Sequence, residues 1–179
     1  MFVARNHKGL LCNALEEKIE KGADFVCPAC SGAVRFKKGK VMQPHFAHIS
    51  LEECRFYREN ESAEHLNLKA ELFRWAVQTE EVEVETFLPA LQQIADLLVD
   101  KRLALEVQCS PLSIERLQER TLSYRQHGYQ VLWLLGRKLW LKDSLTRLQK
   151  DFLYFSKNMG FHLWELDQEK RVLRLKYLI

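Results

Sequence analysis

The pattern of hydrophobic and polar residues changes near residue 58 and divides the chain into two segments. Residues 1–58 are rich in Cys, His, Gly and basic residues and contain no long amphipathic period. We therefore expect a small N-terminal module that is held together by something other than a hydrophobic core. Residues 59–179 follow regular patterns and predict a second domain.

The second domain is predicted to begin with an amphipathic helix. Ser62 is a favourable N-cap residue, and apolar residues follow it at helical spacing. These apolar positions are Leu66, Ala70, Phe73 and Val77. The alternating Val82, Val84 and Thr86 then predict a strand.

Two apolar runs within residues 94–110 are separated by the polar residues 100–102 and predict neighbouring buried strands. Ser113 is then expected to cap a helix that ends at Gly128, followed by a strand at 129–135. The predicted order is helix, three strands, helix, strand, which is a mixed α/β (α+β) fold. A further helix, with Leu145, Leu148, Phe152 and Phe155 on one stripe, should lead to two strands around a turn at 167–170.

Acidic residues stand inside the two apolar runs, where they are least expected. Asp96 lies in the first run, and Glu106 and Gln108 lie in the second. Alternation along a strand directs Glu106 and Gln108 to the face opposite Leu105 and Val107. A buried carboxylate without a partner costs on the order of several kcal/mol, so acids that converge from adjacent strands need a cation. Hard oxygen ligands favour Mg²⁺ or Mn²⁺.

Further residues on the two helices could join this acidic site. Glu64 ends a helical row that should pack on the sheet, and its position near the helix N-terminus is favourable for electrostatic reasons alone. Arg120 and Tyr124 lie one helical turn apart and could face the same site, although a solvated Arg120 is the simpler alternative. The structural alternative to a metal site at Asp96 and Glu106 is a set of salt bridges to Lys69, Arg102 or Arg120.

Four potential zinc ligands form two close pairs in the N-terminal module. Cys27 and Cys30 are followed by His45 and His48, and a short hairpin could bring the pairs together. Four protein ligands leave no open position, so the expected zinc is structural. Cys54 is near enough in the sequence to replace either His, or is simply a small buried residue. A thiol redox function is disfavoured because no βαβ pattern surrounds the cysteine pair.

Composition and charge narrow the class of protein. The 179 residues contain no stretch of about 20 apolar residues and no signal-peptide pattern, so we expect no membrane span and a cytoplasmic location. Five cysteines at uneven spacing favour reduced thiols over a disulfide framework. The net charge of +3 alone does not distinguish between classes of protein. The local cluster of Arg35, Lys37, Lys38 and Lys40 could contact DNA phosphates or merely solvate a hairpin.

Several motifs of the chain resemble the competence protein CoiA-like family in their usual order. They are Cys27–Cys30, Lys38–Lys40 with His45–His48, Glu61–Lys69, Ala95–Asp96, Leu105–Ser110 and Tyr129–Gly136. The resemblance implies an N-terminal zinc-finger-like module and a PD-(D/E)xK nuclease-like domain with a core of helix, three strands, helix, strand. It also implies that Glu64, Asp96, Glu106 and Gln108 are the metal-site positions. The expected role is to act on incoming DNA in natural transformation of Gram-positive bacteria and to promote its recombination.

The chain departs from the pattern of this family at two points. Gln108 stands where the wider nuclease superfamily usually has Lys, so it can orient water but supplies no positive charge. The chain is also shorter than typical members, either as a short relative or as a piece of a longer protein.

Two functions remain open from the sequence. The first is a Mg²⁺- or Mn²⁺-dependent deoxyribonuclease, in which Asp96 and Glu106 hold the metal, Glu64 completes the site and Gln108 positions water. The second is a catalytically inactive accessory factor that grips DNA through the basic module. Single-stranded or branched DNA is the expected partner, together with recombination proteins, and Arg120 is an additional candidate for DNA contact.

Overall fold

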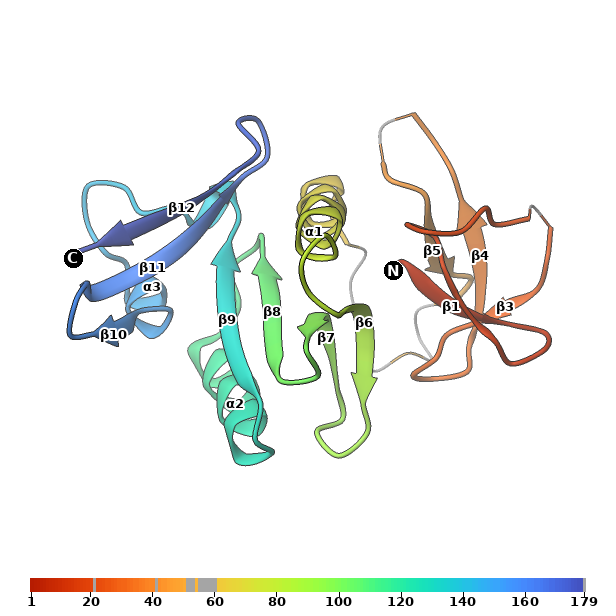
Figure 1. Cartoon of the computed structure of the whole chain (residues 1–179), viewed down its shortest axis with the longest axis horizontal. Coiled ribbons are helices and arrows are strands. Elements are labelled where there is room, and N and C mark those ends of the chain that lie inside the picture. The colour runs from red at the N-terminus through yellow and green to blue at the C-terminus, as the bar shows by residue number, and fades with distance from the viewer. Residues whose placement is uncertain (21, 41, 51–53, 55–60, 179) are drawn as a thin grey trace.

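The computed structural model describes residues 1–20, 22–40, 42–50, 54 and 61–178. They form two sheets that lie along one elongated molecule (Figure 1). The N-terminal sheet occupies one end, and the last strands of the chain occupy the other. The predicted boundary between residues 58 and 59 lies outside the described residues.

The N-terminal sheet has five short antiparallel strands in the order β2-β1-β3-β4-β5. They are β1 (Val3–Asn6), β2 (Leu11–Asn13), β3 (Phe25–Val26), β4 (Ala33–Lys37) and β5 (His45–His48). One small hydrophobic core lies inside, built from Met1, Ala4, Phe25, Cys27, Val34, Phe46 and Cys54. The expectation of a module without a hydrophobic core was therefore wrong. Each short strand contains only two or three apolar residues, too few to produce a visible period.

The second sheet contains the predicted succession of helix, three strands, helix and strand. These elements are α1 (Ala63–Ala76), β6 (Val82–Leu88), β7 (Gln93–Val99), β8 (Leu103–Gln108), α2 (Ile114–Gln126) and β9 (Gln130–Leu135). Ser62 and Ser113 cap the two helices, as expected, by accepting backbone N–H groups in the first turn. Strands β6, β7 and β8 are antiparallel, and β9 runs parallel to β8.

The C-terminal part extends this sheet through β11. After a 3₁₀ turn η1 (Arg137–Leu139) come α3 (Arg147–Asp151), β10 (Tyr154–Ser156), β11 (Gly160–Asp167) and β12 (Val172–Tyr177). The two final strands were expected, but the predicted helix reaching Phe155 was not found. A capping box at Thr146 starts α3, which ends after Asp151, and Phe155 then pairs with Phe161 of β11.

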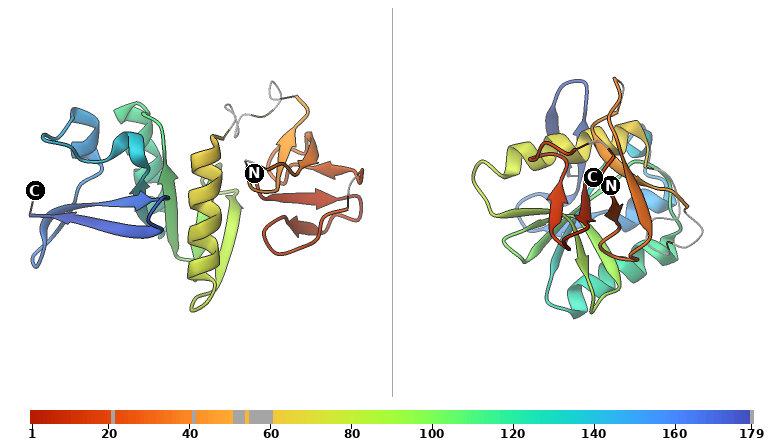
Figure 2. Two further views of the ribbon diagram at one scale, coloured as in Figure 1. Left: turned by 90° about the horizontal axis from the view of Figure 1, so that it is seen from above. Right: turned by 90° about the vertical axis from the view of Figure 1, so that its right-hand side faces the viewer.

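Helices α1 and α2 cover opposite faces of the second sheet (Figure 2). Leu66 and Phe73 of α1 pack with Leu97 and Leu105 on one face, and Leu117 and Tyr124 of α2 pack on the other. Side chains of β7 and β8 therefore meet different helices according to the face they occupy. Among the described residues, no helix is long and apolar enough to cross a membrane.

Strand β1 connects the two sheets. Phe2 and Val3 belong to the core beneath α1, and their backbone N–H groups donate to Glu85 Oε2 at 2.5 and 3.2 Å. The Met1 ammonium group also pairs with Glu61 Oε2 at 2.7 Å. The N-terminal module is thus docked on the second domain through buried polar contacts.

Candidate functional site

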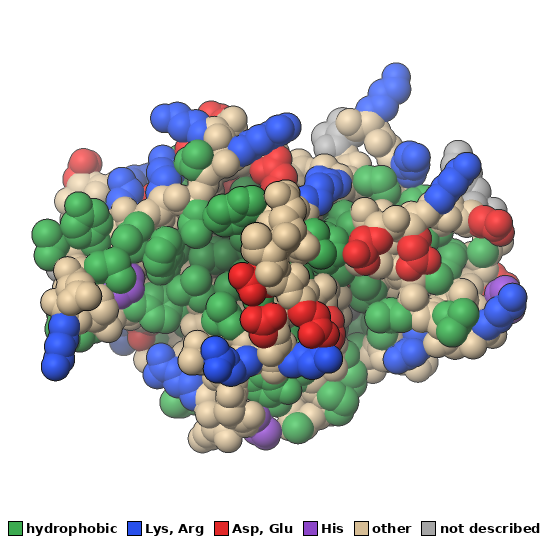
Figure 3. Space-filling model, in the orientation of Figure 1, with side chains coloured by type: hydrophobic (Ala, Val, Ile, Leu, Met, Phe, Trp, Pro, Cys, Tyr) green, Lys and Arg blue, Asp and Glu red, His purple; other side chains and the backbone are tan. Residues whose placement is uncertain are grey.

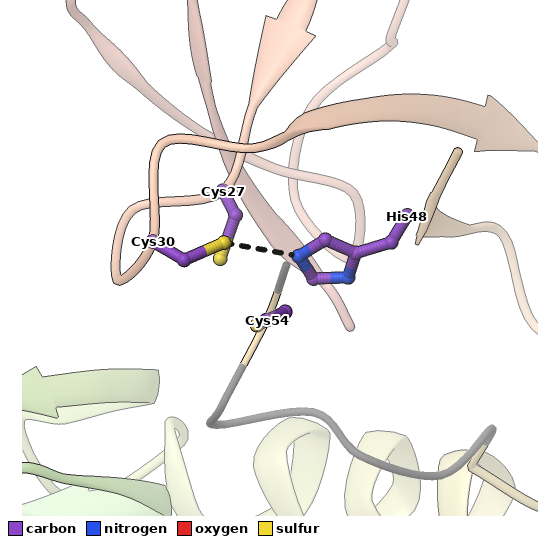
Figure 4. A group of neighbouring side chains, drawn as sticks. All are labelled: Cys27, Cys30, His48 and Cys54. Carbon is purple, nitrogen blue, oxygen red and sulfur yellow. Dashed lines mark hydrogen bonds between the residues drawn. The ribbon is translucent and has the colours of Figure 1, made fainter. Parts of the chain in front are cut away.

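Four side chains of the N-terminal module converge on a site that could bind a metal such as zinc (Figure 4). One ligand atom from each of Cys27, Cys30, His48 and Cys54 lies within 4.8 Å of all the others. Cys30 Sγ is 3.5 Å from His48 Nε2. Three thiols and one imidazole are a donor set that zinc binds with tetrahedral coordination.

The turn after Cys27 shapes this site. The Ser31 N–H donates to the Cys27 carbonyl, and the Cys27 N–H donates to the Gly32 carbonyl, each at 2.9 Å. A Cβ at Gly32 would lie 3.2 Å from Cys30 Sγ, so glycine leaves room for the sulfur. Burial, with the adjacent Cys30 thiol, raises the pKa of Cys27 to about 12. A bound cation is what would make this thiolate favourable.

His45 lies outside this group, which corrects the predicted ligand set. His45 and His48 begin and end the strand β5, three positions apart, so they point to opposite faces. His45 Nδ1 instead contacts the Gln43 carbonyl at 2.8 Å. Cys54 takes the fourth place, which was the alternative that the sequence left open. Assigning 45–48 to a strand would have excluded one of the two His residues.

In the second domain, Asp96 and Glu106 lie at the point where the pairing between β7 and β8 ends. The strands are paired up to Leu97 and Leu105, and Asp96 and Glu106 come next in the same register. No further pair follows there; instead Asp96 Oδ2 accepts the backbone N–H of Val107 at 2.9 Å. The two acids are therefore neighbours at the open end of the ladder.

The Asp96 side chain faces α1 and is held by two cations. Its Oδ2 is 3.2 Å from His65 Nε2, and its Oδ1 is 3.4 Å from Lys69 Nζ. Burial opposes the charged carboxylate, but Lys69 and His65 hold the pKa of Asp96 well below its usual range. Burial likewise opposes the imidazolium, but Asp96 raises the pKa of His65 to about 9.

Glu61 and Glu85 complete the network around Lys69. Glu61 Oε1 contacts Lys69 Nζ and lies 3.1 Å from His65 Nδ1, while Glu85 Oε1 lies 2.7 Å from Lys69 Nζ. Glu61, His65 and Asp96 also offer ligand atoms within 4.8 Å of one another. The sequence analysis did not select Glu61 or Glu85. Glu85 could have been noticed as an acid inside the alternating run 82–88.

The Glu106 side chain faces α2, where it is 2% exposed. Its Oε1 accepts from Arg120 Nη2 at 2.8 Å and from the Tyr124 hydroxyl at 2.5 Å. Burial raises the pKa of Glu106 to about 7, because the opposing effect of Arg120 is partly offset by the negative charge of Asp96. Arg120 also lies over the Trp133 ring, 5.2 Å from its centroid. These contacts already occupy part of the Arg120 guanidinium within the protein, and its contact with DNA stays a prediction.

Asp96 and Glu106 thus do not converge on one face as expected. Glu85, opposite Asp96, has a positive φ of 52°, and alternation along β7 is broken beside it, so Asp96 and Leu97 both meet the α1 side. Such a local irregularity re-aims a side chain. The salt-bridge alternative is present in the structure for both acids: Asp96 pairs with Lys69 and Glu106 with Arg120.

Glu64 and Gln108 lie near the ends of β8 and β9. Glu64 Oε1 accepts the Arg137 N–H at 2.9 Å, and Gln108 Nε2 donates to the Ser110 carbonyl at 2.6 Å. A Cβ at Gly136 would lie 3.2 Å from Glu64 Oε1 and 2.7 Å from Cys109 Sγ, so β9 passes close to both residues. Glu64 therefore binds backbone rather than joining Asp96.

The predicted basic cluster is exposed on the N-terminal module. Arg35 and Lys37 lie two positions apart in β4, so they share one face of the strand. Lys38 and Lys40 follow in the loop between β4 and β5. All four side chains are accessible to a ligand.

The chain matches two family models that together span nearly all of it. Residues 61–179 match the model described as "Competence protein CoiA, nuclease-like domain", and residues 11–57 match "Competence protein CoiA, N-terminal domain". The chain belongs to the competence protein CoiA family. The sequence resemblance is thereby confirmed.

A search of curated proteins gives one informative relative. "Competence protein CoiA" of Bacillus subtilis (strain 168) is 32% identical over 159 residues, which cover 87% of this chain and 40% of the relative. The chain thus spans less than half the length of the relative it matches. No solved structure matches the chain.

Proposed function

We propose that this chain is a Mg²⁺- or Mn²⁺-dependent deoxyribonuclease of the PD-(D/E)xK type that acts on incoming DNA in natural transformation. The observation that carries the proposal is the placement of Asp96 and Glu106 in opposed register where β7 and β8 separate. The family model of a nuclease-like domain supports it. Promotion of recombination, recombination-protein partners and a cytoplasmic location belong to the same proposal.

Asp96 and Glu106 would hold the metal between the separated ends of β7 and β8, with the Glu106 side chain turned from its contacts on α2 toward Asp96. The metal supplies charge neutralisation at a scissile phosphate when bound. Carboxylate oxygens are suitable donors for either ion. His65 and the Val107 N–H orient Asp96, whereas Tyr124 and Arg120 hold Glu106 on the α2 side without metal. Gln108 lies two residues beyond Glu106 on the same strand and is assigned to orient water.

The N-terminal module is proposed to hold one structural zinc on Cys27, Cys30, His48 and Cys54. Its fit rests on the three thiols and one imidazole that converge there and on the space that Gly32 leaves beside Cys30. The exposed Arg35, Lys37, Lys38 and Lys40 are then positioned to contact DNA phosphates.

Thermal melting with and without metal tests the acidic site. Millimolar Mg²⁺ or Mn²⁺ should raise the Tm of the wild type, since a ligand bound only by the folded state adds about 2.7 kcal/mol at 100 times its Kd. Asp96→Asn and Glu106→Gln should abolish this rise, while Glu81→Gln, in an exposed pair with Lys101, should keep it. A metal-insensitive wild type, or an equal rise in Asp96→Asn, would exclude the metal site.

The second candidate is a DNA-binding accessory factor that retains the nuclease fold without cleavage. The specific observation in its favour is that Lys69 and Arg120 already neutralise Asp96 and Glu106. Both candidates bind DNA, so only cleavage separates them.

A further inference from the structure

A cavity of about 670 Å³ lies between α1 and the β11–β12 hairpin. Its size is in the range of ligand-binding clefts. Leu68, Leu72 and Trp75 form one row of α1 along one wall. Leu166, Val172 and Leu173 form the opposite wall. The cavity is a separate feature of the fold, because its lining includes none of the five acids of the candidate site, Glu61, Glu64, Glu85, Asp96 and Glu106.

Trp75 stands at the mouth of the cavity with 62% of its surface exposed. A Trp that packs into a core buries most of its ring, and this one does not. Arg171 lies across from it on the β11–β12 turn and is also exposed. An indole face with a guanidinium opposite can take up a planar, electron-rich group by stacking and cation–π contact.

The charge around the cavity favours an anionic ligand. Arg74 and Arg171 are exposed, whereas the two acids in the lining have partners within the protein. Asp167 is 5% exposed and accepts the N–H groups of Glu169 and Lys170, and Glu71 Oε1 lies 3.5 Å from Arg171 Nε. Because Arg171 is itself the partner of Glu71, Arg74 is the lining cation that no acid of the described residues pairs with, and it gives the mouth its positive charge.

This cavity is connected to the basic cluster of the N-terminal module. Arg74 Nη2 donates to Gln43 Oε1 at 2.9 Å, and Gln43 lies in the β4–β5 loop that carries Lys38 and Lys40. Lys and Arg side chains appear along the same upper edge of the molecule, over the β11–β12 turn, where Asp or Glu side chains lie beside them, and over the β4–β5 loop (Figure 3). An extended polyanion could follow this edge from one end to the other.

We infer that the cavity binds single-stranded DNA, with a base stacked on Trp75 and the flanking phosphates held by Arg74 and Arg171. The inference rests on the proposed action on DNA and names the form of DNA that is bound. A single strand is required because stacking on a side chain needs an unpaired base.

Fluorescence anisotropy with a labelled oligothymidylate of about 20 nucleotides tests the inference in buffer without divalent metal. Trp75→Ala should weaken binding about tenfold, the effect of one lost base–aromatic stack, and Trp75→Phe should recover most of it. Phe155→Ala, which removes an equally exposed aromatic residue from β10, should leave affinity unchanged. Arg171→Gln should reduce the slope of log K against log salt by about 1.

An abasic oligomer of the same length separates stacking from phosphate contact. The wild type and Trp75→Ala should bind it equally, because it offers no base to stack. The inference is overturned if Trp75→Ala binds oligothymidylate as tightly as the wild type, as a groove for a partner protein's apolar helix would predict. It is also overturned if the loss persists with the abasic oligomer. If binding depends on Trp75 but no DNA is cleaved in Mg²⁺, only the nuclease proposal is contradicted. If DNA is cleaved but binding does not depend on Trp75, only the inference about this cavity is contradicted.

Discussion

At the scale of single residues, each of the two acids is controlled by cations from a different helix. Asp96 stays ionised because Lys69 and His65 lie beside it, whereas burial raises the pKa of Glu106 to about 7 despite Arg120. Two adjacent carboxylates with opposite pKa shifts are a common arrangement in catalytic sites, although ion-pair networks also produce it.

His65 should make folding stability depend on pH. Its folded pKa of about 9 lies above the ordinary 6.5, so its stabilising contribution is complete below pH 6.5 and is lost as the pH rises through 9. Without divalent metal, urea unfolding should show a loss on the order of 2 kcal/mol between these values. His65→Gln should flatten this dependence, and His7→Gln, in an exposed turn, should not. Equal pH profiles for the wild type and His65→Gln would contradict the network.

Asp96 and Glu106 could be recognised from the sequence as candidate site residues, but the face of the sheet that each side chain occupies could not be predicted. Asp96 and Glu106 were recognisable because they interrupt apolar runs, and their salt-bridge partners Lys69 and Arg120 were among the alternatives. Their opposite faces depend on the positive φ of Glu85, a tertiary feature that no periodicity reveals. Glu64 was misplaced because a helical row does not show where the β9 backbone passes.

At the scale of elements, capped helices and apolar strands could be predicted well, and short elements could not. Ser62 and Ser113 mark the starts of α1 and α2 through their own side chains, which is local chemistry. The two-residue strand β3 and the five-residue helix α3 depend on their neighbours instead. The same limit explains His45, because β5 was not recognised as a strand.

The positions of His45 and His48 on β5 therefore lead to a specific prediction about which residues bind zinc. Cys54→Ser should release the metal, because its thiol is one of the four converging donors, whereas His45→Gln should retain it. Elemental analysis of protein purified without added metal checks the outcome, with Cys12→Ser as a control outside the site. Retention in Cys54→Ser together with loss in His45→Gln would restore the ligand pairing expected from spacing alone.

At the scale of the whole molecule, the two sheets share polar and apolar contacts through the first residues. Phe2 and Val3 pack under α1, and Glu85 binds their N–H groups while pairing with Lys69. Unfolding of the N-terminal module should therefore lower the stability of the second domain.

Removal of zinc tests this coupling. Chelation should lower the melting temperature of the whole chain as one transition, because an unfolded module withdraws Phe2 and Val3 from the second domain. Calorimetry and the fluorescence of Trp133, which lies in the core beside α2, should report the same shift. A second-domain transition that stays unchanged after chelation would show that the two parts are independent.

DNA cleavage is the most direct test of the central claim. The wild type should cleave single-stranded, duplex or branched DNA in Mg²⁺ or Mn²⁺, and Asp96→Asn and Glu106→Gln should lose at least 100-fold, roughly the cost of removing a catalytic charge. Glu81→Gln should cleave like the wild type, because its carboxylate is exposed and remote from the separated strands. A wild type that binds all three substrates but cleaves none with either metal, or cleavage that persists undiminished in Glu106→Gln, would contradict the nuclease account.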